Sequence, residues 1–241
     1  MERTRSALIV AVAAAAATTV LTASAASPPA ATPANPDPAL FRSSLQNPYY
    51  PLTPGLVTRL RGTDGDEHFR QVVRITGRTR TIAGVEAVVV RDVVWRADGS
   101  LAEATDDWYA ADRDGNVWYF GEDTATYDEE GHVESREGSW QAGVDGAVAG
   151  IIMPAHPRPS EATRMEFAKG EAEDQAWVVQ RLPSVRTPGG QHAHVVRTLE
   201  WSRLEPGVVS MKFYARGLGI VEERDISAGS EHFWVVSAER P

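Results

Sequence analysis

Part of this sequence occurs twice, and the repeat constrains the fold more than any other feature. The longest patch reappears 106 positions later: Thr81, Gly84, Ala87, Val89, Val90 and Arg91 match Thr187, Gly190, Ala193, Val195, Val196 and Arg197. Two shorter patches keep nearly the same shift: Trp108-Tyr109-Ala110 matches Phe213-Tyr214-Ala215, and Pro48-x-x-Pro51 matches Pro154-x-x-Pro157. A near-constant shift over separated patches predicts a duplicated structural unit of about a hundred residues.

The residues within each copy are typical of β-strands. Short runs rich in Val, Ile, Thr and aromatic residues alternate with Gly, Asp and Asn turns, which indicates an all-β fold. Strands are predicted near residues 56–61, 69–77, 86–96, 102–112 and 116–123, then near 163–167, 175–182, 193–202, 208–216 and 219–225, with a last strand near 232–238. A further hairpin is expected at residues 127–137, followed by a loop to residue 152.

We therefore predict a single all-β domain of two tandem antiparallel meander repeats that form a curved sheet or half-barrel. Asp98-Gly99 and Asp114-Gly115 lie between predicted strands, and Asp-Gly accepts the positive φ angles of tight hairpin turns. Each meander leaves one apolar face uncovered, so the two repeats can cover each other or form one continuous curved sheet.

The chain divides into three predicted parts. A basic start, an apolar run and the small-x-small site Ala23-Ser24-Ala25 mark residues 1–25 as a secretory signal peptide. Residues 26–46 are rich in Pro and Ala and are expected to form a disordered spacer. The β-repeat domain should span residues 47–241, with repeat one at about 47–125 and repeat two at about 153–226.

Cysteine content and charge limit the partners. There is no cysteine, which excludes disulfides and a thiol-linked lipid, so we expect a secreted, extracellular protein with no stable membrane anchor. The formal net charge is −9. This acidity argues against nucleic acid and against anionic membrane surfaces, because both are bound through a basic footprint.

Three motifs carry a family resemblance. They are Asn47-Pro48-Tyr49-Tyr50-Pro51-Leu52-Thr53-Pro54-Gly55, Asp107-Trp108-Tyr109-Ala110-x-Asp112-x-Asp114-Gly115-Asn116-Val117-Trp118-Tyr119-Phe120-Gly121-Glu122, and Phe213-Tyr214-Ala215-x-Gly217-x-Gly219-Ile220-Val221. The chain resembles a set of poorly characterised exported proteins from actinobacteria and other bacteria, although Arg216 stands where that set usually has proline. The resemblance implies a curved antiparallel sheet, distantly similar to the half-barrels of periplasmic lipoprotein carriers, and it implies no activity.

One turn resembles the start of a calcium loop. Asp112, Asp114 and Asn116 alternate around Gly115, and oxygen ligands spaced in this way can converge on one calcium ion. Residues 117–120 read as a strand, however, which would carry the acids that follow away from the turn. A solvated hairpin turn is therefore the alternative to a calcium site, and no other cofactor is expected.

A second candidate metal site is a pair of histidines. His192 and His194 should share one face of a strand, because side chains repeat every second residue. Such a pair can bind zinc or copper if a third ligand arrives from a neighbouring strand. The alternative is that both imidazoles are simply exposed beside the turn.

The sequence holds no complete catalytic set, so we name no catalytic residue and expect no enzyme. Nucleophile-elbow, phosphate-loop and metalloprotease motifs are all absent. The neighbouring carboxylates Asp106-Asp107 and Glu122-Asp123 could perform acid–base chemistry, but adjacent strand residues face opposite sides, so one of each pair should point inward. A hydrolase with an unrecognised site is the weaker alternative.

Aromatic residues suggest a binding surface. We expect one set of side chains to line the concave face of the sheet: Trp108, Trp118, Tyr119, Trp201 and Tyr214. Such a surface could hold a lipid or another small amphipathic ligand, while the alternative is that these side chains fill the core. The leading hypothesis is a secreted, non-catalytic protein that binds a hydrophobic or amphipathic ligand, and the alternative is an extracellular calcium- or transition-metal-binding protein.

Overall fold

The structure is a computed structural model that describes residues 34–41 and 46–241. The predicted signal peptide, residues 1–25, lies outside the described residues. The described chain contains one short 3-10 helix, η1 (Pro38–Phe41), and otherwise only strands and loops. None of its helices is long and apolar enough to cross a membrane.

The strands follow the two predicted meanders. The first half contains β1 (Val57–Asp64), β2 (Glu67–Ile82), β3 (Val85–Arg96), β4 (Leu101–Ala111) and β5 (Val117–Tyr127). The connection contains β6 (Val133–Ser135), β7 (Trp140–Gln141) and β8 (Val148–Met153). The second half contains β9 (Ala162–Arg164), β10 (Glu166–Phe167), β11 (Asp174–Thr187), β12 (Gly190–Ser202), β13 (Val209–Ala215), β14 (Gly219–Ser227) and β15 (Glu231–Glu239).

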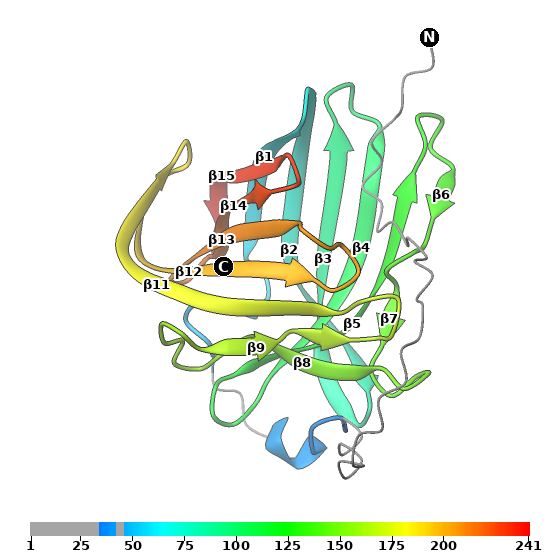
Figure 1. Cartoon of the computed structure of the whole chain (residues 1–241), viewed down its shortest axis with the longest axis vertical. Helices are drawn as coiled ribbons and strands as arrows, with labels where there is room; N and C mark the ends of the chain where they lie inside the picture. Colours follow the sequence, from blue (N-terminus) through cyan, green and yellow to red (C-terminus); the bar gives the residue numbers. More distant parts are fainter. Residues whose placement is uncertain (1–33, 42–45) are drawn as a thin grey trace, which may run out of the picture.

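All these strands belong to one antiparallel sheet. Its order is β10-β8-β5-β4-β3-β2-β1-β15-β14-β13-β12-β11-β9, while β6 and β7 pair with β5. The two meanders join where β1 pairs with β15. Figure 1 shows β2–β5 crossing β11–β13 at a steep angle, so the curved sheet brings its two halves face to face. The predicted all-β half-barrel is confirmed.

The repeated motif lies at equivalent hairpins in the two halves. Thr81 is the next-to-last residue of β2 and pairs with Glu86 of β3. Thr187 ends β11 and pairs with Gly190 of β12. Each copy of the motif therefore contains the turn of a long hairpin, β2–β3 in the first half and β11–β12 in the second. Two further strands of the meander follow each hairpin.

Two segments differ from the sequence-based expectation. Residues 148–153, expected as a loop, form β8 and pair with β5 and β10. Part of the predicted disordered spacer is instead packed on the sheet: Asn35 exchanges hydrogen bonds with the backbone of Ala147 and Ala149, and Phe41 contacts Trp118 edge to face. Composition alone does not predict this packing, because the hydrogen-bond partners of Asn35 lie more than a hundred positions away in the sequence.

Gly121 is required by a close approach of two strands. Its φ is +128°, and a Cβ placed there would lie 2.2 Å from the carbonyl oxygen of Trp140. We expect Gly121→Ala to destabilise the protein by about 2 kcal/mol, because it combines backbone strain with a clash against backbone. Gly99→Ala is the matched control: its φ is +94° but no atom lies within 4 Å, so urea unfolding should show a loss of only about 1 kcal/mol. Equal losses in the two variants would contradict the role of the strand contact.

The alternation along the strands separates the charges of the sheet. On β4, Asp107 faces the second half of the sheet and bonds to Tyr119. Its neighbour Asp106 faces outward and pairs with Arg78 and Arg91. The prediction that adjacent carboxylates point to opposite sides is therefore confirmed for this pair, and it leaves carboxylates enclosed between the two halves.

Candidate functional site

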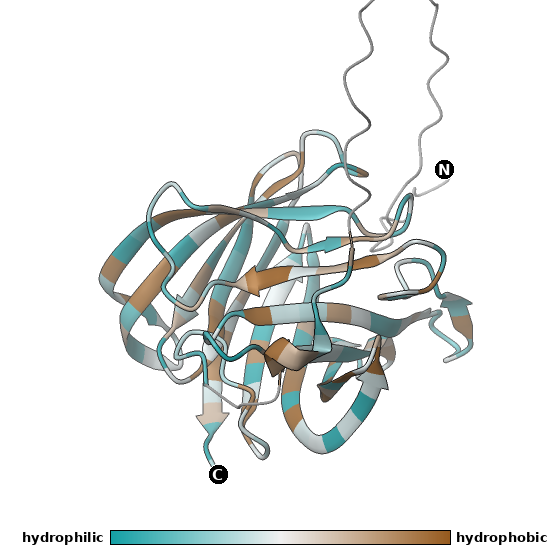
Figure 2. Ribbon diagram, turned by 90° about the horizontal axis from the view of Figure 1, so that it is seen from below, coloured by the Kyte–Doolittle hydropathy of each residue, from teal (hydrophilic) through white to brown (hydrophobic). Residues whose placement is uncertain are grey.

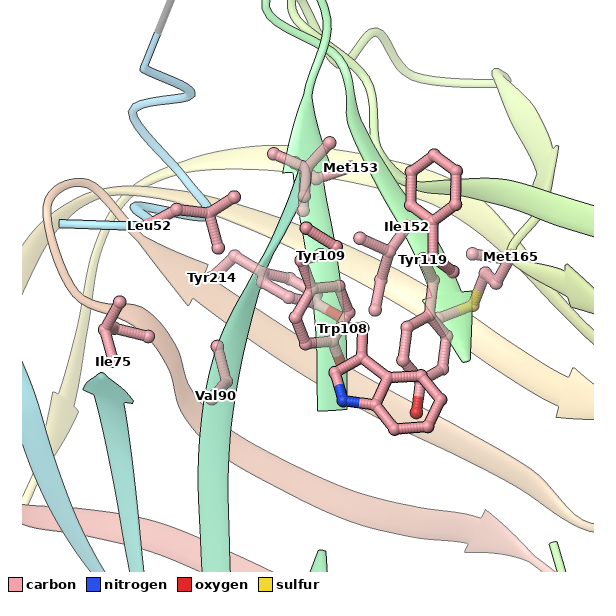
Figure 3. Close-up of a cluster of buried hydrophobic side chains, with 14 of the residues drawn as sticks. Leu52, Ile75, Val90, Trp108, Tyr109, Tyr119, Ile152, Met153, Met165 and Tyr214 are labelled. Atoms are coloured by element: carbon pink, nitrogen blue, oxygen red, sulfur yellow. The ribbon is translucent and has the colours of Figure 1, made fainter. Parts of the chain in front are cut away.

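A cavity of about 230 Å³ lies between the two meanders. β1–β4 form one wall and β13–β14 form the other, and Tyr50 and Ile152 also line the cavity. Figure 3 shows Tyr109 and Tyr214 reaching toward one another from the two halves. The cavity thus lies at the junction of the repeats.

The lining is divided between apolar and polar side chains. The apolar residues are Pro51, Leu60, Val73, Ile75, Val90, Ile152, Leu218 and Ile220. The polar and charged residues are Tyr50, Thr58, Gln71, Asp92, Asp107, Tyr109, Lys212, Tyr214 and Glu223. Among the described lining residues Lys212 is the only cation, so carboxylates outnumber positive charges.

Asp107 is the central carboxylate of the first wall. Its Oδ1 accepts hydrogen bonds from the hydroxyls of Tyr119 at 2.7 Å and Tyr109 at 3.2 Å. The two phenol rings are stacked with centroids 4.6 Å apart. Burial raises the pKa of Asp107 to about 6, against the lowering effect of the two tyrosine hydrogen bonds. The group can therefore gain or lose a proton near neutral pH.

A second carboxylate lies directly across from Asp107. Glu122 of β5 is its cross-strand partner, and like charges directly opposite one another are destabilising. Burial and the charge of Asp107 raise the pKa of Glu122 well above its usual value. Burial likewise raises the pKa of Glu103 and of Glu166 nearby.

The second wall contains a three-membered ion cluster. Lys212 Nζ lies 3.4 Å from Glu200 Oε2 and 3.3 Å from Glu223 Oε2. Glu200 Oε1 also accepts hydrogen bonds from the hydroxyls of Tyr214, at 2.8 Å, and Thr198, at 2.7 Å. Burial alone would lower the pKa of Lys212, but the two glutamates outweigh it and raise that pKa well above its usual value. Lys212 is therefore held in its charged form.

Two acceptor atoms on the cavity wall have no partner. Gln71 Nε2 donates to Asp92 Oδ2 at 2.7 Å. Gln71 Oε1 and Asp92 Oδ1 accept no hydrogen bond from the described residues. Burial, followed by the charge of Asp107, raises the pKa of Asp92 well above its usual value. A buried acceptor without a donor is costly, so this corner of the cavity suits a ligand that brings N–H or O–H groups.

The predicted aromatic surface is only partly at this site. Tyr214 lines the cavity and Tyr119 bonds to Asp107. Trp108 is buried beneath the guanidinium of Arg80. Trp118 donates its indole N–H to Asp112 at 2.9 Å. Trp201 lies beside Glu200, whose side chain faces Lys212, so alternation directs Trp201 to the outer face. The structure therefore brings together tyrosines and carboxylates rather than the predicted tryptophans.

The predicted calcium turn is closed by internal hydrogen bonds. The Asp112 carboxylate accepts four of them, from the backbone N–H groups of Asp114 and Asn116 and the side chains of Asn116 and Trp118. Burial raises the pKa of Asp112, but these bonds outweigh it and the net pKa is lowered. A calcium ion would have to displace these donors, and its binding stays a prediction.

The two histidines do not share one environment. His192 is buried and its Nε2 lies 2.8 Å from Thr187 Oγ1. His194 is exposed and has a φ of +53°, which interrupts the alternation of the strand. Among the described residues no group of three or more His, Asp or Glu side chains is placed to hold a metal ion.

The sequence indicated Asp107 and Glu122 only as members of adjacent acid pairs, and it did not connect them with the other enclosed carboxylates. The sequence of β4 does contain a pattern that could reveal them. Polar residues occupy every second position, Glu103, Thr105, Asp107 and Tyr109, and they alternate with small or outward-facing residues. This spacing puts all four on one strand face. Which face is enclosed depends on the second half of the chain, which the strand sequence does not contain.

Comparison with known proteins finds only distant structural likeness. No protein-family model and no curated protein matches this chain. A protein from Bacteroides fragilis, described as exported and with a YmcC-like fold, has a TM-score of 0.46 at 14% identity, over 79% of this chain and 98% of that one. A protein from Parabacteroides distasonis, described as a lipoprotein, has a TM-score of 0.45 at 11% identity, over 81% of this chain and all of that one. These likenesses carry no information on what this chain binds.

Proposed function

We propose that this protein is an exported, non-catalytic binding protein whose cavity between the two meanders holds a small amphipathic ligand with an ammonium group. One observation carries the proposal: the cavity joins an apolar wall to an excess of carboxylates and to two unpartnered acceptors. An apolar cavity of roughly 150 Å³ accommodates benzene, so a cavity of about 230 Å³ has room for a slightly larger molecule.

The acidic side chains that line the cavity determine which ligand charge is preferred. Asp92 and Asp107 lie near other carboxyl groups, so the negative charge of one carboxylate raises the free energy of ionising its neighbours. A bound ammonium group would lower that free energy and supply donors to Asp92 Oδ1 and Gln71 Oε1. The alkyl part of the ligand would lie against Val73, Ile75 and Val90. A carboxylate ligand would meet the same acids and be repelled.

We expect hexylammonium to bind, hexanol to bind more weakly, and hexanoate not to bind. Isothermal titration and protein-observed NMR at pH 7 with the three probes would measure the preference. Asp92→Asn should weaken hexylammonium binding at least about tenfold, because a charge-assisted hydrogen bond is lost, and leave hexanol unchanged. Asp106→Asn is the matched control, since this side chain points outward to Arg78 and Arg91.

Two results would contradict this proposal. Equal affinity for the three probes would reduce the site to an apolar cavity without charge selectivity. An effect of Asp106→Asn as large as that of Asp92→Asn would show that the probe binds at the surface. The calcium and histidine-metal functions, and a hydrolase, stay alternatives from the sequence.

A further inference from the structure

A second cavity, of about 450 Å³, lies beside the cavity between the meanders. The two cavities share no lining residue, but Tyr49 lines the second and its neighbour Tyr50 lines the first. Small-molecule sites typically measure roughly 300–1,000 Å³. The second cavity therefore has room for a ligand of its own.

Segments from both repeats meet at this second cavity. Pro48 belongs to the first Pro-x-x-Pro motif and His156 to the second. The turn between β4 and β5 contributes Asp114, and the turn between β13 and β14 contributes Arg216. Because β4 and β13 carry the matching aromatic motifs, these two turns are equivalent in the sequence repeat. The second cavity is therefore formed only when the two halves of the chain come together.

Hydrogen bonds fix these segments to one another. Asn47 Nδ2 donates to the carbonyl oxygens of Gly115, in the β4–β5 turn, and of Pro154, which follows β8, each at 2.9 Å. The backbone N–H of Gly217, in the β13–β14 turn, donates to the carbonyl oxygen of Pro48 at 2.7 Å. The walls are thus held in place without a ligand, and such preorganisation lowers the free-energy cost of binding.

Arg181 brings a charged side chain to the inner face of β11. Figure 2 shows hydrophilic and hydrophobic residues alternating along the strands. On β11 the inner face carries the buried Ala176 and Val178, and beyond a bulge it carries Arg181. Arg181 pairs with Val196 of β12, which pairs with Tyr214 of β13, so these three side chains share one face of the sheet. The position of Arg181 is therefore set by the register of three strands.

The two arginines of the second cavity have no acidic partner. Arg181 Nε donates to the carbonyl oxygen of Pro157 at 3.0 Å, which orients the guanidinium group. The side chain of Arg216 has no hydrogen bond to any residue that the structure describes, and neither arginine forms an ion pair within that part of the chain. Both side chains are exposed. Their remaining N–H groups are therefore available to an anion from solvent.

The other polar groups of the second cavity refine this preference. Asp114 is the only acid among its described lining residues, so the two arginines leave a formal excess of one positive charge. The imidazole of His156 and the hydroxyl of Tyr49 can also donate hydrogen bonds. The Asp114 carboxylate can accept a hydrogen bond from a ligand hydroxyl, and it would repel a second anionic group. The lining therefore suits a ligand with one anionic group and with hydroxyl groups.

We propose that the second cavity binds a small organic anion that carries one carboxylate or phosphate-ester group and several hydroxyl groups. Guanidinium groups bind both kinds of oxyanion through paired N–H donors. An inorganic ion would leave most of the 450 Å³ empty, and a neutral polyol would leave both arginines without a counter-charge. This site is separate from the proposed ammonium site, because the two cavities share no lining residue.

Isothermal titration at pH 7 and low salt compares gluconate and sorbitol 6-phosphate with sorbitol, their neutral counterpart. We expect both anions to bind, and to bind more weakly as the salt concentration rises. Sorbitol should bind at least about tenfold more weakly than either anion, because it forms no charge-assisted pair with the arginines. Tighter binding of gluconate would assign the site to a carboxylate, and tighter binding of sorbitol 6-phosphate would assign it to a phosphate ester. Either result supports the proposal.

Charge variants test whether the arginines bind the anion. Arg216→Gln should weaken the binding of both anions at least about tenfold. It should leave the melting temperature unchanged, since this side chain bonds to no described residue. Asp114→Asn should strengthen binding roughly twofold to fivefold, because a like charge is removed. Arg113→Gln is the matched control: Arg113 is exposed in the same turn as Asp114 but does not line the cavity.

Four results would overturn the proposal. Sorbitol binding as tightly as gluconate would show that charge does not select the ligand. Inorganic phosphate binding as tightly as sorbitol 6-phosphate would reduce the cavity to a site for an adventitious ion only. Equal losses in Arg113→Gln and Arg216→Gln would place the anion on the surface. A loss of gluconate binding in Asp92→Asn as large as that in Arg216→Gln would place the anion in the cavity between the meanders.

Discussion

Replacing Lys212 by methionine is expected to destabilise the protein by about 3–5 kcal/mol at neutral pH. The ammonium group lies between Glu200 and Glu223, which are only 7% and 20% exposed. Methionine has a similar length but no charge, so it would leave both carboxylates without their cation. Breaking a buried ion pair by removing one partner is costly because the remaining charge is left unsolvated.

Two further variants separate this charge effect from a packing effect. Lys169→Met is the matched control, because Lys169 is the only other lysine and is exposed. It should change the free energy of unfolding by less than about 0.5 kcal/mol. Lys212→Met/Glu223→Gln should recover part of the loss, since one uncompensated charge is removed. Urea unfolding of the three proteins measures these differences. A loss in Lys212→Met that Glu223→Gln does not relieve would point to packing instead.

The protein is expected to be more stable at pH 5 than at pH 8, by at least about 2 kcal/mol. Burial raises the pKa of Asp107 to about 6 and that of Glu231 to about 8. In the unfolded chain both carboxyls ionise near pH 4. The folded protein therefore holds protons that the unfolded chain has already released. This contribution to stability is fully present below about pH 4 and is lost as the pH rises through about 6 for Asp107 and about 8 for Glu231.

The variant Glu231→Gln tests the origin of this dependence. Its neutral amide resembles the protonated acid, so the fall in stability between pH 5 and pH 8 should become smaller. Glu67→Gln is the control, because Glu67 begins the nearby strand β2 but is exposed. Urea unfolding at several pH values gives both slopes. A stability that rises from pH 5 to pH 8 would show that these carboxylates are ionised at low cost in the folded protein.

Both expectations describe a polar interior that weakens the fold. Asp107 opposite Glu122 is a like-charge pair between neighbouring strands, and Asp92 keeps an unpartnered oxygen. Apolar side chains in the same space would avoid these unfavourable contributions to the free energy of folding. Groups with strongly shifted pKa values around a cavity are typical of functional sites, which is why we place the ligand there.

The sequence predicted the strands well where turns and alternation agreed. The hairpin expected at residues 127–137 exists, since Tyr127 pairs with Val133. The strand expected at 86–96 is β3, Val85–Arg96. The prediction failed for β8, because Val148–Met153 contains Gly150 and carries no turn-bounded alternation. There the backbone of Arg164 comes so close that a Cβ on Gly150 would lie 2.3 Å from its carbonyl oxygen.

The candidate site was much less predictable than the strands. Asn47 was assigned only as the start of the domain, yet its buried side chain bonds to Gly115 and Pro154 and to the backbone N–H groups of Tyr49 and Tyr50. These bonds hold the segment that presents Tyr50 to the cavity. Contacts of this kind join residues 68 to 107 positions apart, and no local pattern records them.

Local chemistry was sufficient for the strand periodicity and the turns, because these depend on residues within a few positions of one another. Only the folded chain decided that Asp107 and Lys212 would line one enclosed space and that Arg181 and Arg216 would line a second cavity. A strand's period of two specifies which side chains share a face, but the curvature of the whole sheet determines which face becomes the interior.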